Sequence, residues 1–385
     1  MLVQDVRIVS GSRGGAEPSD ILVRDGRIRR IAARGSIAVE PGFRIVPGGG
    51  RWIIPGLIEP TASLSEAVLT RGFLYNGVTT VRDIASQMGL TADLRDAIEA
   101  GRVPGPRVFF SGLQFFPGAE PSGANTGDLW HVTAGEAGAV RGLALAKGFG
   151  ATSAYLYQAE TLEDAERFVR LAHESGLRVT YARFPLLSFV AAGLDQALDV
   201  PFGESVRDDV VQLFRASGVG LATGITYWSL YGQVQSNPGI LDEPETASFL
   251  TPFLRGQGGA RSVSRLPFYD AMARVTRTNV ARLHRAGVAT GAEGGGVPPW
   301  SLHAEMEERV RAGVSPGAAL EAATRVNARI LGAEGDLGSI EEGKVADLLL
   351  LDADPLADIR NTRRIHAVIQ GGRLVDREAL LRPSN

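Results

Sequence analysis

Strand-like and helix-like segments alternate through the middle of the chain (55–343). The apolar run GVTTVRDIA (77–85) precedes the helical pattern TADLRDAIEAGR (91–102), and the helical pattern TLEDAERFVRLAHESG (161–176) leads into LRVTYARF (177–184). Repeated strand–helix units are typical of a parallel sheet with right-handed crossovers. We count about eight units over roughly 280 residues, which predicts an α/β protein with a (β/α)8 TIM barrel. A doubly wound open sheet is the alternative, and it is disfavoured because no Gly-rich dinucleotide fingerprint follows the first strand.

The two ends of the chain show a different pattern. Residues 2–54 carry short alternating runs of apolar and polar residues separated by turn signals such as RDGR, and the C-terminal segment contains ADLLLLDADP and IHAVIQGGRLVD. This alternation is typical of short β-strands. Because chain termini often lie close together, we predict that residues 1–54 and 344–385 form one small β-sandwich domain and that residues 55–343 form the barrel domain.

Composition excludes several kinds of site and partner. The 385-residue chain has a formal net charge of −3, so it lacks the basic excess that binds nucleic acid. It has no cysteine, which excludes disulfides, thiolate metal ligands and a cysteine nucleophile. No apolar stretch reaches the ~18–20 residues that span a bilayer, and the N-terminal MLVQDVRIVSGSRG lacks a signal-peptide pattern. We therefore expect a cytoplasmic protein that binds neither nucleic acid nor a membrane.

Three segments carry a family resemblance. WIIPGLIE (52–59) and NGVTTVRD (76–83) are similar to the first and second barrel strands of the amidohydrolase superfamily. The long stretch from His303 to Ile359 resembles that family's last barrel helices and its return to a small β-domain. Within it, SPGAALEAATRVNARILG (315–332) begins with a Ser cap and a Pro in the first turn, and apolar residues follow at helical spacing. The most similar subgroup is that of the imidazolonepropionases and metal-dependent dipeptidases, and the resemblance covers nearly the whole chain.

The resemblance also implies a metal centre, from which this chain departs. Members of the family hold divalent metal ions with a His-x-His pair on strand 1, Lys or Glu on strand 4, His on strands 5 and 6, and Asp on strand 8. His-x-His suits this role because alternate residues of a strand share one face and neutral imidazoles bind zinc. The corresponding positions here are Thr61, Ser63, Tyr155, Tyr181, Asp199 and Glu293. A single histidine near the expected barrel mouth, His303, does not make a zinc site with such partners. We therefore expect neither a bound metal ion nor another cofactor.

The replacement residues are oxygen-bearing groups. Carboxylates in an apolar barrel mouth tend to have raised pKa values because burial disfavours the charged form, and a phenol can donate to a developing oxyanion. Asp199 and Glu293 are the expected acid and base, with Tyr155 and Tyr181 as donors. Packing alone is the competing explanation for any one of these positions. Strand ends and aromatic loops supply the residues expected to contact substrate: Glu59, Thr61, Ser63, Asp83, Tyr157, Arg183, Trp228, Trp300 and His303.

This set of side chains suits proton transfer. We hypothesise a metal-independent lyase, isomerase or cyclase that acts on a small, partly apolar carbonyl compound by acid–base chemistry. One alternative is a catalytically silent homologue that serves as a binding or interaction protein. The other is a hydrolase of C–N bonds with an atypical oxygen-ligand metal site built from Glu59, Asp199 and Glu293. The resemblance implies a homodimer or a larger homo-oligomer. Isomerisation, elimination and cyclisation are all open at this stage.

Overall fold

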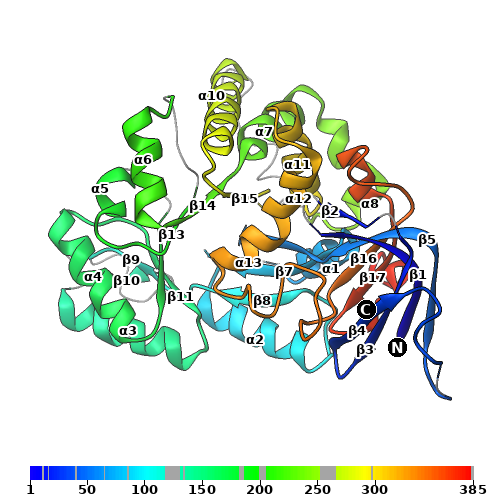
Figure 1. Ribbon diagram of the computed structural model, residues 1–385. Coiled ribbons are helices and arrows are strands. Elements are labelled where there is room, and N and C mark those ends of the chain that lie inside the picture. The colour runs from blue at the N-terminus through cyan, green and yellow to red at the C-terminus, as the bar shows by residue number, and fades with distance from the viewer. Residues whose placement is uncertain are drawn as a thin grey trace.

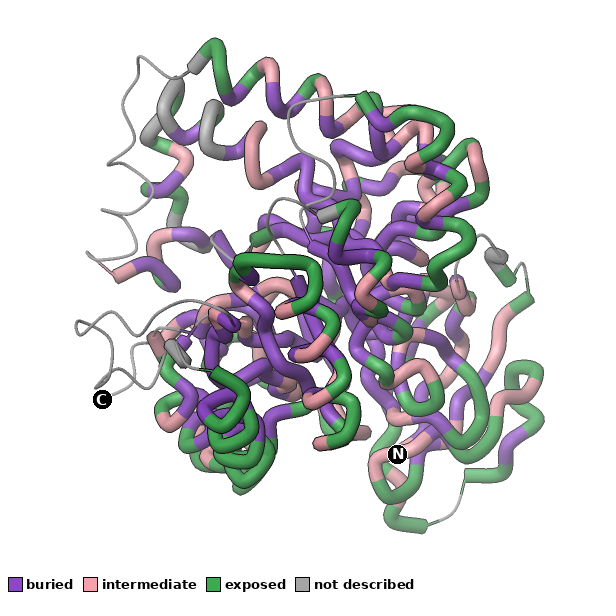
Figure 2. The backbone as a smooth tube through the Cα atoms, turned by 90° about the vertical axis from the view of Figure 1, so that its left-hand side faces the viewer, coloured by how far each residue is buried: buried purple, intermediate pink, exposed green. Residues whose placement is uncertain are grey.

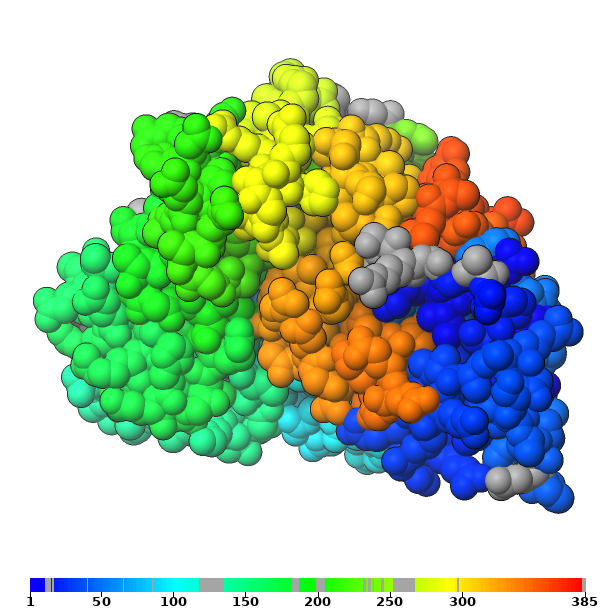
Figure 3. All heavy atoms as spheres, in the orientation of Figure 1, coloured from blue at the N-terminus to red at the C-terminus, as the bar shows by residue number. Residues whose placement is uncertain are grey.

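Two bodies of β-structure organise the chain, a terminal sheet built from both ends and a barrel-like ring built from the middle (Figure 1). The computed structural model describes residues 1–385 except 11–12, 16, 40, 65, 85, 118–130, 133–134, 182–185, 199–204, 252–265, 296–297 and 383–385. The space-filling view in Figure 3 shows the blue N-terminal and the orange-to-red C-terminal segments adjoining at one end of the molecule. Within the described part of the chain, no helix combines the length and the apolar character needed to cross a bilayer.

The terminal sheet joins the two ends of the chain through backbone hydrogen bonds. Its order is β18-β17-β16-β5-β1-β3-β4, with β2 paired to β1. β1 and β5 run parallel, whereas β16 pairs antiparallel with β5. All four leucines of β16 are buried, because this strand lies inside the sheet with both faces covered. The strands are β1 (Leu2–Ser10), β2 (Arg13–Gly14), β3 (Ser19–Arg24), β4 (Arg27–Ala33), β5 (Ile45–Pro55), β16 (Leu348–Leu351), β17 (Ile365–Gln370) and β18 (Arg373–Leu374).

The sandwich expected from the two ends is not confirmed. Their described strands join edge to edge into one eight-stranded sheet instead of forming two stacked sheets. The physical reason is the pairing of β5 with both β1 and β16, which makes the C-terminal strands an extension of the N-terminal sheet. The division of the chain into residues 1–54 with 344–385 and residues 55–343 stays a prediction.

The barrel-like ring consists of parallel strands in two sheets. One sheet has the order β6-β7-β8 and the other the order β10-β9-β11-β12-β13-β14-β15. Among the described strands, backbone pairing does not close the ring, because β8 and β9 belong to different sheets and β15 is not paired with β6. The fold is therefore α/β and TIM-barrel-like. The strands are β6 (Leu57–Ala62), β7 (Val78–Asp83), β8 (Arg107–Phe110), β9 (Gln114–Phe115), β10 (His131–Val132), β11 (Ser153–Leu156), β12 (Arg178–Tyr181), β13 (Gln196–Ala197), β14 (Gly220–Thr223) and β15 (Thr290–Ala292).

Helices follow the ring strands and cover their outer face (Figure 1), and Figure 2 shows the buried parts of the chain gathered towards the centre of the molecule. The predicted strand–helix repeat is the reason, since each helix buries one apolar face against the sheet. The helices are α1 (Val68–Tyr75), α2 (Met88–Glu99), α3 (Glu136–Gly148), α4 (Leu162–Glu174), α5 (Leu186–Val190), α6 (Asp208–Ser217), α7 (Ile225–Ser236), η1 (Pro238–Leu241), α8 (Pro244–Ala247), α10 (Leu266–Arg285), α11 (Ser301–Arg311), α12 (Pro316–Glu321), η3 (Ala322–Val326), α13 (Asn327–Ile330), η4 (Ile359–Arg363) and α14 (Arg377–Leu380).

A buried asparagine bridges the unpaired edges of β6 and β15. The predicted Ser cap is confirmed, since the side chain of Ser315 accepts a hydrogen bond from the backbone N–H of Ala318 at the start of α12. A π-type turn, η3, links α12 to α13 and brings Asn327 to the ring. The amide of Asn327 donates at 2.7 Å to the carbonyls of Ile58 and Ala292. The side chain of Asn327 thus links the first and last ring strands, whose backbones are not paired.

Candidate active site

The ring interior is the set of side chains that lie between opposite strands of the barrel-like ring. It contains Glu59, Thr61, Arg82, Tyr155, Thr180, Gln196 and Glu293. Strand alternation selects these residues, because successive side chains of a strand point to opposite faces. On β11, for example, Ala154 and Leu156 pack with Phe168 in the apolar cluster under the helices, so Tyr155 takes the interior face.

On β12 the alternation places Thr180 inside and Tyr181 outside. Val179 and Tyr181 belong to the apolar cluster under the helices, and the ring of Tyr181 meets Phe189 of α5 edge-on, with centroids 5.0 Å apart. Burial raises the pKa of Tyr181 to about 12. This position differs from the donor role expected for Tyr181, because a shift of one residue along a strand moves the side chain to the other face. Thr180 occupies the interior position, where its Oγ1 accepts a hydrogen bond from Arg82 at 3.0 Å.

Two carboxylates meet where β6 and β15 approach each other. The N–H of Thr61 donates to Glu59 Oε1 at 3.0 Å, and the hydroxyl of Thr61 donates to Glu293 Oε2 at 2.7 Å. The N–H of Gly294 donates to the other oxygen of Glu59 at 2.8 Å. Both carboxylates are buried, whereas Thr61 is half-buried. The structure thus brings together Glu59, Thr61 and Glu293, three of the residues expected from the sequence.

The surroundings of Glu59 favour its protonated form. Burial raises the pKa of Glu59 well above its ordinary value, and the charges of Glu293 and Glu305 act in the same direction. The backbone hydrogen bonds from Gly294 and Thr61 oppose the shift without cancelling it. A carboxyl kept neutral beside a second carboxylate is the usual arrangement of a general acid with its base.

The raised pKa of Glu59 predicts a pH-dependent loss of stability. The folded state holds the Glu59 proton at a pH where the unfolded chain has released it, so the free energy of unfolding falls as the pH rises from the unfolded pKa through the folded one. Glu59→Gln removes this slope. We expect the free energy of unfolding of Glu59→Gln, measured with urea across a pH series, to improve relative to wild type as the pH rises. Parallel curves for the two proteins would contradict this, and the exposed Glu163→Gln is the control.

Arg82 crosses the ring interior and is the main residue that the sequence analysis missed. From β7 its Nε donates to the carbonyl of Pro60 on β6 at 2.9 Å, and its Nη1 donates to Thr180 Oγ1 on β12. Thr180 in turn donates to Gln196 Oε1 at 2.7 Å. Burial lowers the pKa of Arg82 to about 9, against the raising effect of Glu293 and other neighbours. The sequence feature that could have pointed to Arg82 is its place next to Asp83 in β7, a strand in which every residue is buried.

The carboxylate of Asp83 binds backbone N–H groups of the segments that follow β6 and β7 instead of facing the ring interior. Its Oδ2 accepts from the N–H of Leu64 at 2.7 Å, and its Oδ1 accepts from the N–H of Ser86 at 2.8 Å. The hydroxyl of Ser86 lies 3.2 Å from that of Ser63. Asp83 and Ser63, both expected to contact substrate, thus connect the segments that follow β6 and β7.

His303 lies away from the ring interior. Its Nε2 donates to the carbonyl of Asn76 at 2.8 Å, and its Nδ1 lies 2.9 Å from the hydroxyl of Thr362. Burial, reinforced by the charge of Arg363, lowers the pKa of His303 to about 3. His303 is therefore a neutral bridge from α11 to the end of α1 and to η4, which differs from the substrate contact expected from its place in the sequence.

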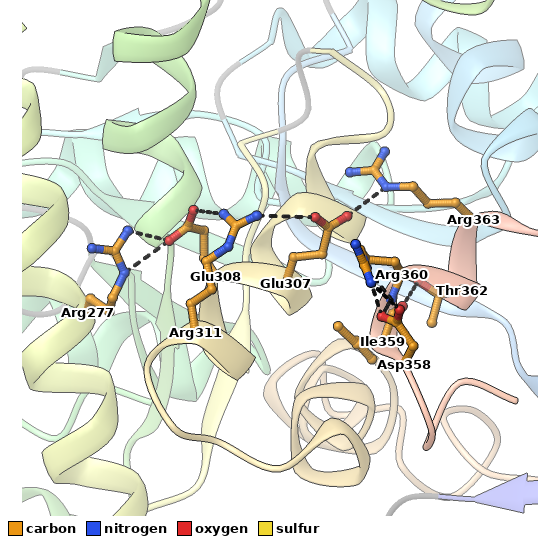
Figure 4. A network of polar contacts seen from close by, with 9 residues as sticks. All are labelled: Arg277, Glu307, Glu308, Arg311, Asp358, Ile359, Arg360, Thr362 and Arg363. Carbon is orange, nitrogen blue, oxygen red and sulfur yellow. Dashed lines mark hydrogen bonds and ion pairs between the residues drawn. The ribbon is translucent and has the colours of Figure 1, made fainter.

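Trp300 lines a cavity of about 380 Å³ between α7, α11 and the terminal sheet. Its indole N–H donates to Thr246 Oγ1 at 2.8 Å, and the guanidinium of Arg363 lies over its ring, 5.0 Å from the centroid. Figure 4 shows a chain of ion pairs along this region, formed by Arg277, Glu308, Arg311, Glu307 and Arg363. The residues that line this cavity do not include the carboxylates of the ring interior.

The aromatic residues expected near substrate pack on other rings. Tyr157 is half-buried, and its ring lies 4.8 Å from that of Phe116 and 5.8 Å from that of Tyr155. The ring of Trp228 packs with its aromatic neighbours Tyr227, Phe268 and Tyr269. Asp199 and Arg183, also expected in the site, lie outside the described residues.

The described side chains do not match the metal centre that the resemblance implies. Among them, no three His, Asp or Glu residues lie together in a group that could hold a metal ion. The ring interior offers two carboxylates, and the charge of Arg82 interacts with both Glu293 and Glu59. A guanidinium at that place would repel a divalent cation.

Comparison with known proteins adds sequence and fold evidence. Residues 247–375 match the model of the amidohydrolase family. A solved structure of a proposed prolidase from Bifidobacterium longum shares 25% identity, with 99% of this chain and 98% of that chain covered and a TM-score of 0.77. A Xaa-Pro dipeptidase with bound methionine shares 18% identity over 97% of this chain and 99% of that chain, with a TM-score of 0.77.

A molinate hydrolase shares 18% identity over 100% of this chain and 96% of that chain, with a TM-score of 0.78. At these lower identities the likeness concerns the fold. No curated protein matches the sequence. The family model over residues 247–375 and the solved structures agree with the resemblance to the amidohydrolase superfamily that the sequence carries.

Proposed function

We propose that this protein is a metal-independent enzyme that moves protons on a small, partly apolar carbonyl compound. The observation that carries the proposal is the buried pair of Glu59 and Glu293, linked through Thr61. A carboxyl that burial keeps protonated is an effective general acid, and a second carboxylate beside it is the corresponding base. Such a pair supports those isomerisations, eliminations or cyclisations that begin with removal of a proton next to a carbonyl group.

The first step assigns one role to each residue. Glu293 takes the proton from the carbon next to the carbonyl, and the electron pair of that C–H bond moves to give an enolate. The protonated carboxyl of Glu59 donates a hydrogen bond to the enolate oxygen, and Tyr155 is a second candidate donor. Return of a proton from Glu293 to the same position of that carbon completes an exchange, and its delivery to the opposite face or to a different carbon completes an isomerisation. No step needs a metal ion, in keeping with the donor set among the described residues.

Hydrolysis of a C–N bond is the second candidate function. It is favoured by the solved structures, whose names include a prolidase, a molinate hydrolase and a phenylurea hydrolase. An oxygen-ligand metal site for this reaction would combine Glu59 and Glu293 with Asp199, which lies outside the described residues.

One assay separates these functions. The purified protein is incubated in D2O with a set of small carbonyl compounds and, separately, with Xaa-Pro dipeptides and phenylureas, and the products are followed by proton NMR. We expect protein-dependent exchange of protons next to the carbonyl group, with or without a chelator. Hydrolysis that needs added metal, without exchange, would replace the proposal by the second function. Absence of both reactions across the set would favour a silent binding protein.

A further inference from the structure

Arg82 carries a donor group that the described part of the chain leaves without a partner. The residue is 1% exposed. Its Nε donates to the carbonyl of Pro60 and its Nη1 to Thr180, but its Nη2 is buried and has no hydrogen-bond partner among the described residues. A buried donor of a charged group that lacks a partner costs stability, and such groups are uncommon in folded proteins. The position therefore suits a hydrogen-bond acceptor that a bound ligand supplies.

The two bonds made by Arg82 fix the direction of this unused group. Pro60 lies on β6 and Thr180 on β12, which are not neighbours in either ring sheet, so the guanidinium spans the ring interior. Thr180 is itself held by Gln196, which donates to the carbonyl of Ile330 in α13. The planar guanidinium is thus anchored on two of its three nitrogens, and the third is presented by a rigid support.

The charges around Arg82 suit the binding of an oxygen atom that carries negative charge. The groups whose charges act on Arg82 include Glu293, Tyr155, Glu59 and Arg178. The charges of Glu293 and Arg82 are opposite in sign. The guanidinium of Arg82 can therefore stabilise the negative charge that develops on a carbonyl oxygen. Hydrogen bonds from a guanidinium to an oxyanion are among the stronger ones in proteins.

We propose that Nη2 of Arg82 binds the carbonyl oxygen of the substrate as it becomes an oxyanion, and that the site accordingly binds small carboxylates that mimic this state. The inference rests on the proposed function of Glu59 and Glu293 and adds a third member to it. In this role the guanidinium of Arg82 stabilises negative charge on the carbonyl oxygen, as a bound cation does in many hydrolases. The substrate class is therefore a carbonyl compound that forms an enolate.

Benzoate is the probe, because it is small, partly apolar and carries a fixed carboxylate. Isothermal titration of wild type with sodium benzoate is expected to show binding, and benzyl alcohol, the neutral comparison, to bind more weakly. Arg82→Met should weaken benzoate binding by about 10- to 100-fold, the effect of losing a charged hydrogen bond. Arg107→Met is the matched control, since this arginine of the neighbouring strand pairs with Asp347 outside the interior. Its Kd for benzoate should equal that of wild type.

A second measurement covers the case in which Arg82→Met does not fold. Wild type labelled with 15N-arginine should show a shift of the Arg82 guanidinium signal, assigned with Arg82→Lys, when benzoate is added. An unshifted signal, absence of benzoate binding to wild type, or an unchanged Kd in Arg82→Lys would overturn the proposal for Arg82.

The proposed function can fail separately. Glu293→Gln should still bind benzoate, and more tightly than wild type, because a neighbouring negative charge is removed. If benzoate binds through Arg82 but no carbonyl compound exchanges its protons, the acid–base function is wrong and the anion site stands. If carbonyl compounds exchange their protons but benzoate binding does not depend on Arg82, the acid–base function stands and the anion site at Arg82 is wrong.

Discussion

Replacing Glu293 by glutamine is expected to slow proton exchange by about 10²–10⁴-fold, the usual contribution of a general base. The change removes the proposed base but keeps its hydrogen bond with Thr61. Glutamine still offers an oxygen to the hydroxyl of Thr61, which donates to Glu293 at 2.7 Å in the wild type. The effect should therefore appear in kcat with little change in the free energy of unfolding.

Glu307→Gln is the control for this prediction. Glu307 is also a poorly exposed glutamate, but it lies on α11 and pairs with Arg363 and Arg311 beside the separate cavity. Its exchange rate should match that of wild type. Full activity of Glu293→Gln would remove the base from the account, whatever its effect on stability.

Arg309→Met is expected to destabilise the protein by about 3–5 kcal/mol, as removal of one partner of a buried ion pair does. Arg309 is 2% exposed, and its Nε donates to Glu305 Oε1 at 2.9 Å. Its other nitrogens donate to the backbone carbonyls and hydroxyls of Thr223 and Thr290, and to the carbonyl of Gly291. One side chain of α11 thus joins β14 to β15. Without it, Thr226 is the one remaining hydrogen-bond partner of the buried Glu305 carboxyl among the described residues.

Urea unfolding measures this loss, and Arg311→Met is its matched control. Arg311 lies on the same helix and also pairs with a glutamate, but its side chain is 56% exposed. Its replacement should cost about 1 kcal/mol or less, in the range of surface ion pairs. The double variant Glu305→Leu, Arg309→Met should recover part of the loss, because it leaves no unpaired buried charge. Equal unfolding midpoints for Arg309→Met and Arg311→Met would show that the buried pair contributes no more than a surface one.

The sequence predicted the fold more fully than the site, and the reason is physical. The regular strand–helix spacing shows which faces of the strands and helices are buried, and the burial of these faces forms the ring. The Ser315 cap is visible in the sequence because it depends only on neighbouring residues. The pairing of Leu348–Leu351 with the N-terminal strands depends on contacts distant in sequence, so one sheet could not be distinguished from a sandwich.

The site depends on finer distinctions. The sequence could identify Glu59, Thr61 and Glu293 as candidates. Glu59 and Thr61 have the i, i+2 spacing that places side chains on one face of a strand, and Glu293 follows a strand end. Thr180 was missed in favour of Tyr181, since an alignment error of one residue inverts the faces of a strand. Arg82 was missed because its role comes from partners on β6 and β12, which no local pattern shows.

The central claim is that oxygen-bearing side chains and Arg82 carry out the catalysis for which the family resemblance implies metal ions. Metal analysis of the purified protein by mass spectrometry, combined with the exchange assay before and after chelation, tests it most directly. The account predicts far less than one transition metal ion per chain and an exchange rate that chelation leaves unchanged. One or two bound ions per chain, with activity lost on chelation and restored by the metal, would contradict it.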